Sequence, residues 1–224
     1  MNLHAVKILF LKDLFLSRKY LFAYLVAGVA FSFLACTPHK TLSFLGFILT
    51  ITVAIASGIH LIGTLMLSES TDQTRLFVMS LPVSLLEYSI GKIAVVLATY
   101  LVPWGTMLML MTGLTFIIPD LTRGAIIVVP TIFLFLLAGF CLQLTTAVAF
   151  ESVGATICVM VGCNVLLNVF MMQLFAIPEV AEIVKGDVII WPSSIVWIVL
   201  VELSIIILSI AFSLALQTRK RDLA

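Results

Sequence analysis

Six long apolar runs alternate with short polar stretches along the chain. The runs cover residues 20–36, 42–67, 93–118, 124–150, 153–175 and 194–216. A helix needs about 20 predominantly apolar residues to cross the hydrocarbon core of a bilayer, so each run is long enough to do so. The pattern predicts an all-α polytopic membrane protein with six transmembrane helices, forming one transmembrane domain over residues 1–224.

The segment before the first run, residues 1–19, is apolar but repeatedly interrupted by ionisable side chains. These are His4, Lys7, Lys12, Asp13, Arg18 and Lys19. Its uninterrupted apolar pieces are too short to cross a bilayer, and we expect an amphipathic interfacial helix on the membrane surface. A positively charged flank of the first span is the alternative. No small-residue cleavage site follows, so we expect no cleavable signal peptide.

The distribution of basic residues predicts the orientation of the spans. Six spans place both termini on one side of the membrane, together with the loop at residues 68–92. That side carries nine of the 12 Lys and Arg residues, and the other side carries Lys40, Arg123 and Lys185. Because cytoplasmic loops are enriched in Lys and Arg, we expect both termini and residues 68–92 in the cytoplasm, and the loop at residues 176–193 outside it.

Composition supports a membrane protein and excludes several other classes. The chain is 62% hydrophobic and 10% charged, whereas soluble domains have about 25% charged residues. The net charge of +1 gives no indication of nucleic-acid binding. The cysteines lie in or beside apolar runs without metal-ligand spacing, and we interpret them as packing residues; they are Cys36, Cys141, Cys158 and Cys163.

Motifs for catalysis and for nucleotide binding are missing from the sequence. It contains no HExxH zinc helix, no GxSxG nucleophile turn and no Asp-rich magnesium pattern. The dipeptide Gly91-Lys92 is followed by Ile93, and Leu86 stands where a GxxxxGK[ST] loop requires its first glycine. We therefore expect no enzyme activity and no cofactor bound by this chain.

A few polar side chains interrupt the apolar runs and are candidates for a translocation path. Glu202 is either a proton relay or a protonated or paired acid, because an ionised carboxylate within a span is costly. His60 is either a ligand or an interhelical hydrogen-bond partner. Gln143, Asn164 and Asn168 either line a path or join helices to one another. Gly154, Cys158 and Gly162 form a ridge of small residues that permits close helix contact.

Two loops have further features. Residues 176–193 contain acidic residues and the apolar patch Val188–Trp191, which indicates either a short re-entrant element or an ordinary outer loop with an interfacial tryptophan. Residues 68–92 predict a helix, a turn at Pro82 and a second helix capped by Ser84. The apolar side chains of this loop either contact a partner protein or lie on lipid.

The order of residue types in this loop resembles the permeases of type-2 ATP-binding-cassette (ABC) transporters. Those chains have an acid after span two, an L-P-V-S piece, a second acid and G-K at the start of span three. The corresponding residues here are Glu69, Leu81-Pro82-Val83-Ser84, Glu87 and Gly91-Lys92. The six spans and the basic N-terminal segment agree with the same layout.

The resemblance implies a small permease subunit of the bacterial cytoplasmic membrane. Residues within the loop, around Thr74 to Glu87 and including Arg75, Phe77 and Leu81, would contact separate ATPase subunits that bind ATP and Mg²⁺. Glu69, Glu87 and Lys92 would hold the loop to its neighbours. The resemblance further implies a dimer of permease subunits, identical or different, that exports a peptide, lipid or other amphipathic substrate.

Two other functions stay open from the sequence. An ion- or proton-coupled carrier would use Glu202 and His60 and would need no ATPase. A non-transporting membrane assembly subunit would need neither.

Overall fold

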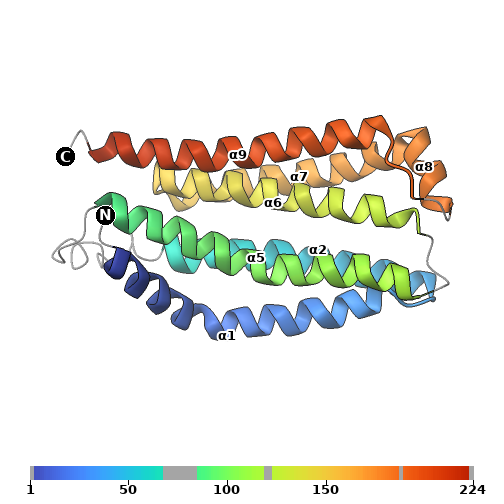
Figure 1. Ribbon diagram of the computed structural model, residues 1–224, viewed down its shortest axis with the longest axis horizontal. Helices are drawn as coiled ribbons and strands as arrows, with labels where there is room; N and C mark the ends of the chain where they lie inside the picture. The colour runs from blue at the N-terminus through green and yellow to red at the C-terminus, as the bar shows by residue number, and fades with distance from the viewer. Residues whose placement is uncertain (1–2, 68–84, 119–122, 187–188, 222–224) are drawn as a thin grey trace.

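A computed structural model describes residues 3–67, 85–118, 123–186 and 189–221. In this part of the chain it is an elongated bundle of helices with no strand (Figure 1). The elements are α1 (Leu3–Ala35), α2 (Lys40–Ile62), the π-helical turn η1 (Gly63–Leu67), α5 (Leu85–Ile117), α6 (Ala125–Phe150), α7 (Val153–Ala176), α8 (Pro178–Lys185) and α9 (Ser193–Arg221). The predicted all-α class is confirmed.

Six of these helical segments are long and apolar enough to cross a membrane, which confirms the predicted polytopic membrane protein. They are Phe10–Ala35, Lys40–Leu67, Ile90–Ile117, Ile126–Phe150, Val153–Ala176 and Ser193–Leu216. Both ends of the chain lie at one end of the bundle (Figure 1). We call this the proximal end, and the opposite end, which carries α8, the distal end.

The N-terminal segment differs from its expected boundary. Residues 3–19 do not form a helix of their own, because α1 continues without a break from Leu3 to Ala35. The apolar stretch able to span a membrane already begins at Phe10, ten residues before the predicted start of span one. The first turns of α1 are inclined to the rest of the helix (Figure 1). No proline or glycine occurs before Gly28, so nothing in the sequence interrupts the helix there.

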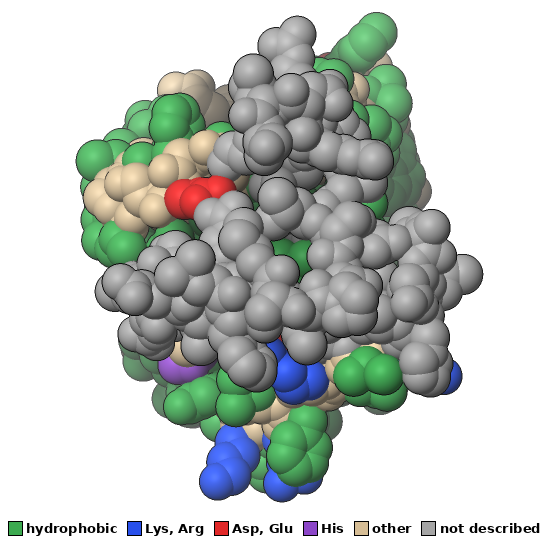
Figure 2. All heavy atoms as spheres, turned by 90° about the vertical axis from the view of Figure 1, so that its left-hand side faces the viewer, with side chains coloured by type: hydrophobic (Ala, Val, Ile, Leu, Met, Phe, Trp, Pro, Cys, Tyr) green, Lys and Arg blue, Asp and Glu red, His purple; other side chains and the backbone are tan. Residues whose placement is uncertain are grey.

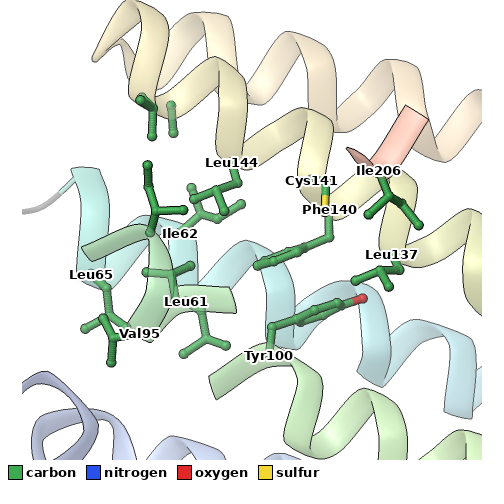
Figure 3. Packing of buried hydrophobic residues seen from close by; sticks show 14 of the residues in the cluster. Leu61, Ile62, Leu65, Val95, Tyr100, Leu137, Phe140, Cys141, Leu144 and Ile206 are labelled. Atoms are coloured by element: carbon green, nitrogen blue, oxygen red, sulfur yellow. The ribbon is translucent and has the colours of Figure 1, made fainter. Parts of the chain in front are cut away.

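Helix α6 is the centre of the bundle. Of its apolar stretch 67% is buried, compared with 11% for α1 and for α7. The rings of Tyr100 on α5 and Phe140 on α6 stack with centroids 3.8 Å apart, and Leu137, Cys141 and Ile206 lie around them (Figure 3). Helices α2, α5, α7 and α9 pack on α6, and α1 packs on α2 and α5. The helices leave large apolar side chains exposed on the outside, as expected for surfaces in contact with lipid.

The two ends of α6 make different local contacts. At the proximal end, α6 ends at Glu151 in the left-handed conformation (φ 50°), and Ser152 caps α7 by accepting a hydrogen bond from the backbone N–H of Ala155. The very short Glu151-Ser152 turn predicted from the sequence is therefore present. At the distal end, the amide of Gly124 donates to the carbonyl of Gly186 after α8 (3.1 Å).

Candidate functional site

Three carboxylate or ammonium side chains are buried in the described part of the chain, namely Asp13, Lys92 and Glu202. Two of them meet. The ammonium of Lys92, near the start of α5, lies 3.0 Å from Oδ2 of Asp13 on α1, and both side chains are at most 5% exposed. Because each ion satisfies the other away from water, this pair differs from the weak ion pairs of protein surfaces.

The Lys92 ammonium also donates to the carbonyl oxygen of Leu65, at 3.0 Å. Leu65 belongs to η1, so the ammonium connects three elements: α1, η1 and α5. The ring of Tyr88, one turn earlier on α5, lies 5.9 Å from the same nitrogen, within the range of a cation–π contact. We call Asp13, Lys92 and the Leu65 carbonyl the proximal node.

The local sequence explains why the node forms at this depth. Asp13 and Lys92 lie near the proximal ends of apolar stretches that begin at Phe10 and Ile90, and Leu65 lies near the end of the stretch Lys40–Leu67. Removing a single partner from a buried ion pair costs about 3–5 kcal/mol, because an unpaired charge is left behind. The node is thus a strong constraint on how α1 sits against α5.

The exposed side of the node carries a second cation. The Lys12 ammonium lies 3.5 Å from Oδ1 of Asp13, and its side chain is 54% exposed. The end-on view in Figure 2 shows basic side chains gathered at one edge of the proximal end. Asp13 was not predicted as a site residue from the sequence. Its position could have indicated a role, because it is the only acidic residue before Glu69 and lies in an N-terminal segment otherwise rich in Lys and Arg.

Of the loop at residues 68–92, the structure describes only the last part, residues 85–92. Glu69, Arg75, Phe77, Leu81, Pro82, Val83 and Ser84 lie outside the described residues. Glu87 lies in α5, and Gly91 and Lys92 are buried there. The apolar stretch of the third span begins at Ile90, close to the expected Ile93. Its helix begins earlier, at Leu85, where the second helix of the loop was predicted. The end of the loop and the third span therefore form one continuous helix.

Two predicted path residues share a small cavity. Gln143 on α6 and Asn164 on α7 line it together with Gly58 on α2 and Tyr100 on α5, and its volume is about 20 Å³. That is room for about one water molecule. Asn168, one turn beyond Asn164, is exposed on α7, and its amide donates to the backbone carbonyl of Asn164. The interior of a single chain thus contains no wide polar path at this place.

Glu202 lies on α9, which packs chiefly on α6. Nearer the proximal end of this interface the Thr145 hydroxyl on α6 donates to the carbonyl of Ser209 (3.0 Å), and the Ser213 hydroxyl donates to Thr145 Oγ1 (2.9 Å). Glu202 itself is 3% exposed. Neither of its carboxyl oxygens has a hydrogen-bond partner among the described residues. A carboxyl group in this environment is favoured in its neutral form.

His60 is held by aromatic rings at a different interface. Its ring centroid lies 4.4 Å from that of Tyr20 and 5.8 Å from that of Tyr24, both on α1. One alternative from the sequence was an interhelical hydrogen bond for His60, but its Nε2 atom has no hydrogen-bond partner among the described residues.

The structure does not bring His60 and Glu202 together, because Glu202 lies on α9, which packs chiefly on α6. The described residues include no group of His, Cys, Asp and Glu able to hold a metal ion.

The loop at residues 176–193 contains the short helix α8, which was not predicted. Pro178 begins it, Val180 is buried against the bundle, and Glu179 accepts a hydrogen bond from the Ser194 hydroxyl (3.0 Å). Trp191 is 50% exposed. Helix α8 covers the distal ends of α6 and α7.

Comparison with known protein families, curated proteins and solved structures finds no match to the chain.

Proposed function

We propose that the chain is the permease subunit of a type-2 ABC transporter in the bacterial cytoplasmic membrane. Separate ATPase subunits would drive it through the loop at residues 68–92. The observation that carries the proposal is the order Glu69, Leu81-Pro82-Val83-Ser84, Glu87 and Gly91-Lys92 between the second and third spans. The six apolar helices agree with a permease of this type.

The proximal node supports this role mechanically. Leu65 precedes the loop and Lys92 ends it, and the Lys92 ammonium donates a hydrogen bond to the Leu65 carbonyl. A movement of the loop would therefore move η1 and α5 and, through the ion pair of Lys92 with Asp13, also α1. A loop that transmits work from an ATPase needs such a firm connection to the spans. ATP and Mg²⁺ would be bound by the ATPase and not by this chain.

The translocation path would lie between two permease subunits. The cavity lined by Gln143 and Asn164 has room for about one water molecule, so a large substrate needs more space than one chain encloses there. Helix α7 offers an exposed ridge of small residues, Gly154, Cys158 and Gly162, and it also carries the exposed amide of Asn168. Small residues and amides favour helix association in lipid. The apolar surroundings suit an exported peptide, lipid or other amphipathic substrate.

Purification of the tagged chain from its native membrane tests this proposal. We expect a second chain containing a GxxxxGK[ST] motif to co-purify in equal amount and the complex to hydrolyse ATP. A chain that purifies without any nucleotide-binding partner, and whose membranes transport substrate without ATP, would contradict the proposal.

One observation favours a second candidate, an ion- or proton-coupled carrier. Glu202 is a buried acid without a hydrogen-bond partner among the described residues, and an intramembrane acid is a candidate proton-binding group. In this candidate Glu202 would act without His60, because the two residues lie at different helix interfaces. Transport driven by a proton gradient in vesicles free of ATP would favour this function over the first.

A further inference from the structure

The outward face of α1 carries exposed basic side chains in two rows. An α-helix has 3.6 residues per turn, so residues seven or eleven apart lie nearly above one another. Lys7 and Arg18 form one such row, and both are exposed. Lys12 and Lys19 form the second row and are exposed as well. The two rows are about 120° apart around the helix, so this face presents two lines of positive charge.

Large apolar side chains fill the strip of α1 between the two rows. Phe15 and Phe22 lie in this strip, and both are more than half exposed. The strip continues toward the distal end through Val26 and Phe33, which are also more than half exposed. From Phe22 to Phe33 it covers about 16 Å, close to half of the roughly 30 Å hydrocarbon core of a bilayer. The strip is therefore long enough to contact one acyl chain along its length.

Acidic side chains do not neutralise this face of α1. Asp13 is buried on the opposite side of the helix, where it pairs with Lys92. Of the four basic residues in the two rows, Lys12 approaches its carboxylate, at 3.5 Å. Among the described residues, no carboxylate forms an ion pair with Arg18 or Lys19. The exposed face thus keeps an excess of positive charge.

Arg18 and Lys19 lie deeper than the node. Both belong to the apolar stretch Phe10–Ala35, and they stand about 8 Å further along α1 than Asp13. A cation at the edge of the hydrocarbon region is costly unless its side chain extends to the interface or meets an anion. The Arg18 guanidinium lies 3.8 Å from the centroid of the Phe15 ring, nearly one turn closer to the proximal end. It is therefore directed toward the interface, where lipid phosphates lie.

We propose that this face of α1 binds an anionic phospholipid of the leaflet at the proximal end. One acyl chain lies along the strip from Phe22 toward Phe33. The phosphate accepts hydrogen bonds from Arg18 and Lys19, and the remaining cations of the two rows attract the acidic headgroup. A zwitterionic lipid brings a cation of its own, which these side chains repel, so the face selects anionic lipids.

A second copy of the chain fits this surface less well. In a symmetric dimer the same patch meets itself, and here that would bring the cations of the two copies together, which is unfavourable. The inference goes beyond the proposed function, because it concerns the lipid around the chain. It stands or falls whether or not an ATPase drives the protein.

The test is native mass spectrometry of the full chain in a nonionic detergent, after removal of bound lipid. The protein receives equal amounts of phosphatidylglycerol and phosphatidylcholine with identical acyl chains. The test variant is Arg18→Gln with Lys19→Gln, which removes two cations from the face. The matched control is Lys40→Gln with Lys185→Gln, which removes two exposed cations at the distal end.

We expect the parent chain to bind phosphatidylglycerol at least about tenfold more strongly than phosphatidylcholine, because each basic residue near an anionic lipid strengthens binding severalfold. The test variant should lose most of this preference, and the distal control should keep it. Arg18→Lys with Lys19→Arg should also keep it, since the charge is unchanged. Phosphatidylglycerol with a photoreactive acyl chain should cross-link to the segment of α1 from Phe22 to Phe33.

Four results would overturn the proposal. They are equal binding of the two lipids by the parent chain, an equal loss of preference in the distal control, displacement of the lipid by millimolar inorganic phosphate, and a dimer that disappears in the test variant. The third would assign the cations to a soluble anion, and the fourth would assign the face to a second copy. If the test variant does not fold, Lys19→Gln alone gives the same reading, and an unchanged preference there would equally contradict the proposal.

Discussion

Lys92 and Asp13 belong to different helices, yet their ammonium and carboxylate groups lie 3.0 Å apart with almost no exposure. The same ammonium reaches the Leu65 carbonyl. Both ends of the loop between the second and third spans are thereby joined to each other and to the N-terminal helix. The predictions below begin with this relationship.

Loss of Asp13 should strongly destabilise the protein. Asp13→Ala removes the carboxylate that lies 3.0 Å from the buried Lys92 ammonium, and we expect a loss of about 3–5 kcal/mol in the free energy of unfolding. Replacing both residues together by apolar ones of similar size, as Asp13→Leu with Lys92→Met, should cost much less, because no charge stays unpaired. Chemical unfolding in detergent micelles measures both. An equal loss in the single and double variants would contradict the pairing.

Gly46 should not tolerate a side chain. A Cβ atom placed there would collide with the backbone of Leu34 and Ala35, where α1 and α2 approach each other closely. We expect Gly46→Ala to lower the unfolding free energy by about 1–3 kcal/mol. Gly105→Ala on α5 is the matched control, since a Cβ there meets nothing within 4 Å. That substitution should be neutral or stabilising by up to about 1 kcal/mol.

The stacked rings of Tyr100 and Phe140 predict a large effect of truncation at the centre of the bundle. Phe140 is 3% exposed and stacks on Tyr100 at 3.8 Å, so Phe140→Ala should cost about 3–5 kcal/mol. Phe150, at the end of the same helix, is 69% exposed. Its replacement by alanine should change the unfolding free energy by less than about 0.5 kcal/mol. Thermal unfolding of the two variants side by side measures both effects, and an equal change in the two would contradict the burial of Phe140.

The apolar pattern predicted the six spans, because each helix must be long and apolar to cross the bilayer, and the Glu151-Ser152 turn followed from two polar residues between two runs. Pairings between distant residues do not appear in such a pattern. Asp13 resembled an ordinary flanking charge, and Lys92 was expected to hold the loop at residues 68–92 without a partner on the N-terminal helix. Only the packing of α1 on α5 brings the two residues together. The π-helical turn η1 was not predicted either, since the residues Gly63–Leu67 carry no proline and fit an α-helix equally well.

His60 and α8 illustrate the same limit. The sequence placed His60 inside a span but did not predict that Tyr20 and Tyr24 would enclose it. The segment Pro178–Lys185 was expected as a loop, because it is short and rich in acidic residues. Its helix begins at a proline and is stabilised by burial of Val180 against the bundle, which is a tertiary contact.

Glu202 separates the two candidate functions. Glu202→Gln keeps the size of the side chain and removes its ability to exchange a proton. For an ATP-driven permease we expect this variant to keep at least about half of the wild-type transport rate, because a neutral amide matches the neutral form favoured by burial. For a proton-coupled carrier it should abolish transport driven by a pH gradient. Uptake or efflux in inverted vesicles, with ATP or with a proton gradient as the only energy source, decides between them.

The most direct test of the proposed function is the binding of the ATPase to residues 68–92. Phe77→Asp and Leu81→Asp place a charge in the predicted contact, and Ile189→Asp places the same charge at an exposed apolar residue at the distal end. Quantitative co-purification of the GxxxxGK[ST] partner with each variant, at equal amounts of folded permease, is the measurement. The account predicts that both loop variants lose most of the partner and that Ile189→Asp retains it. Full retention by Phe77→Asp and Leu81→Asp would contradict the account.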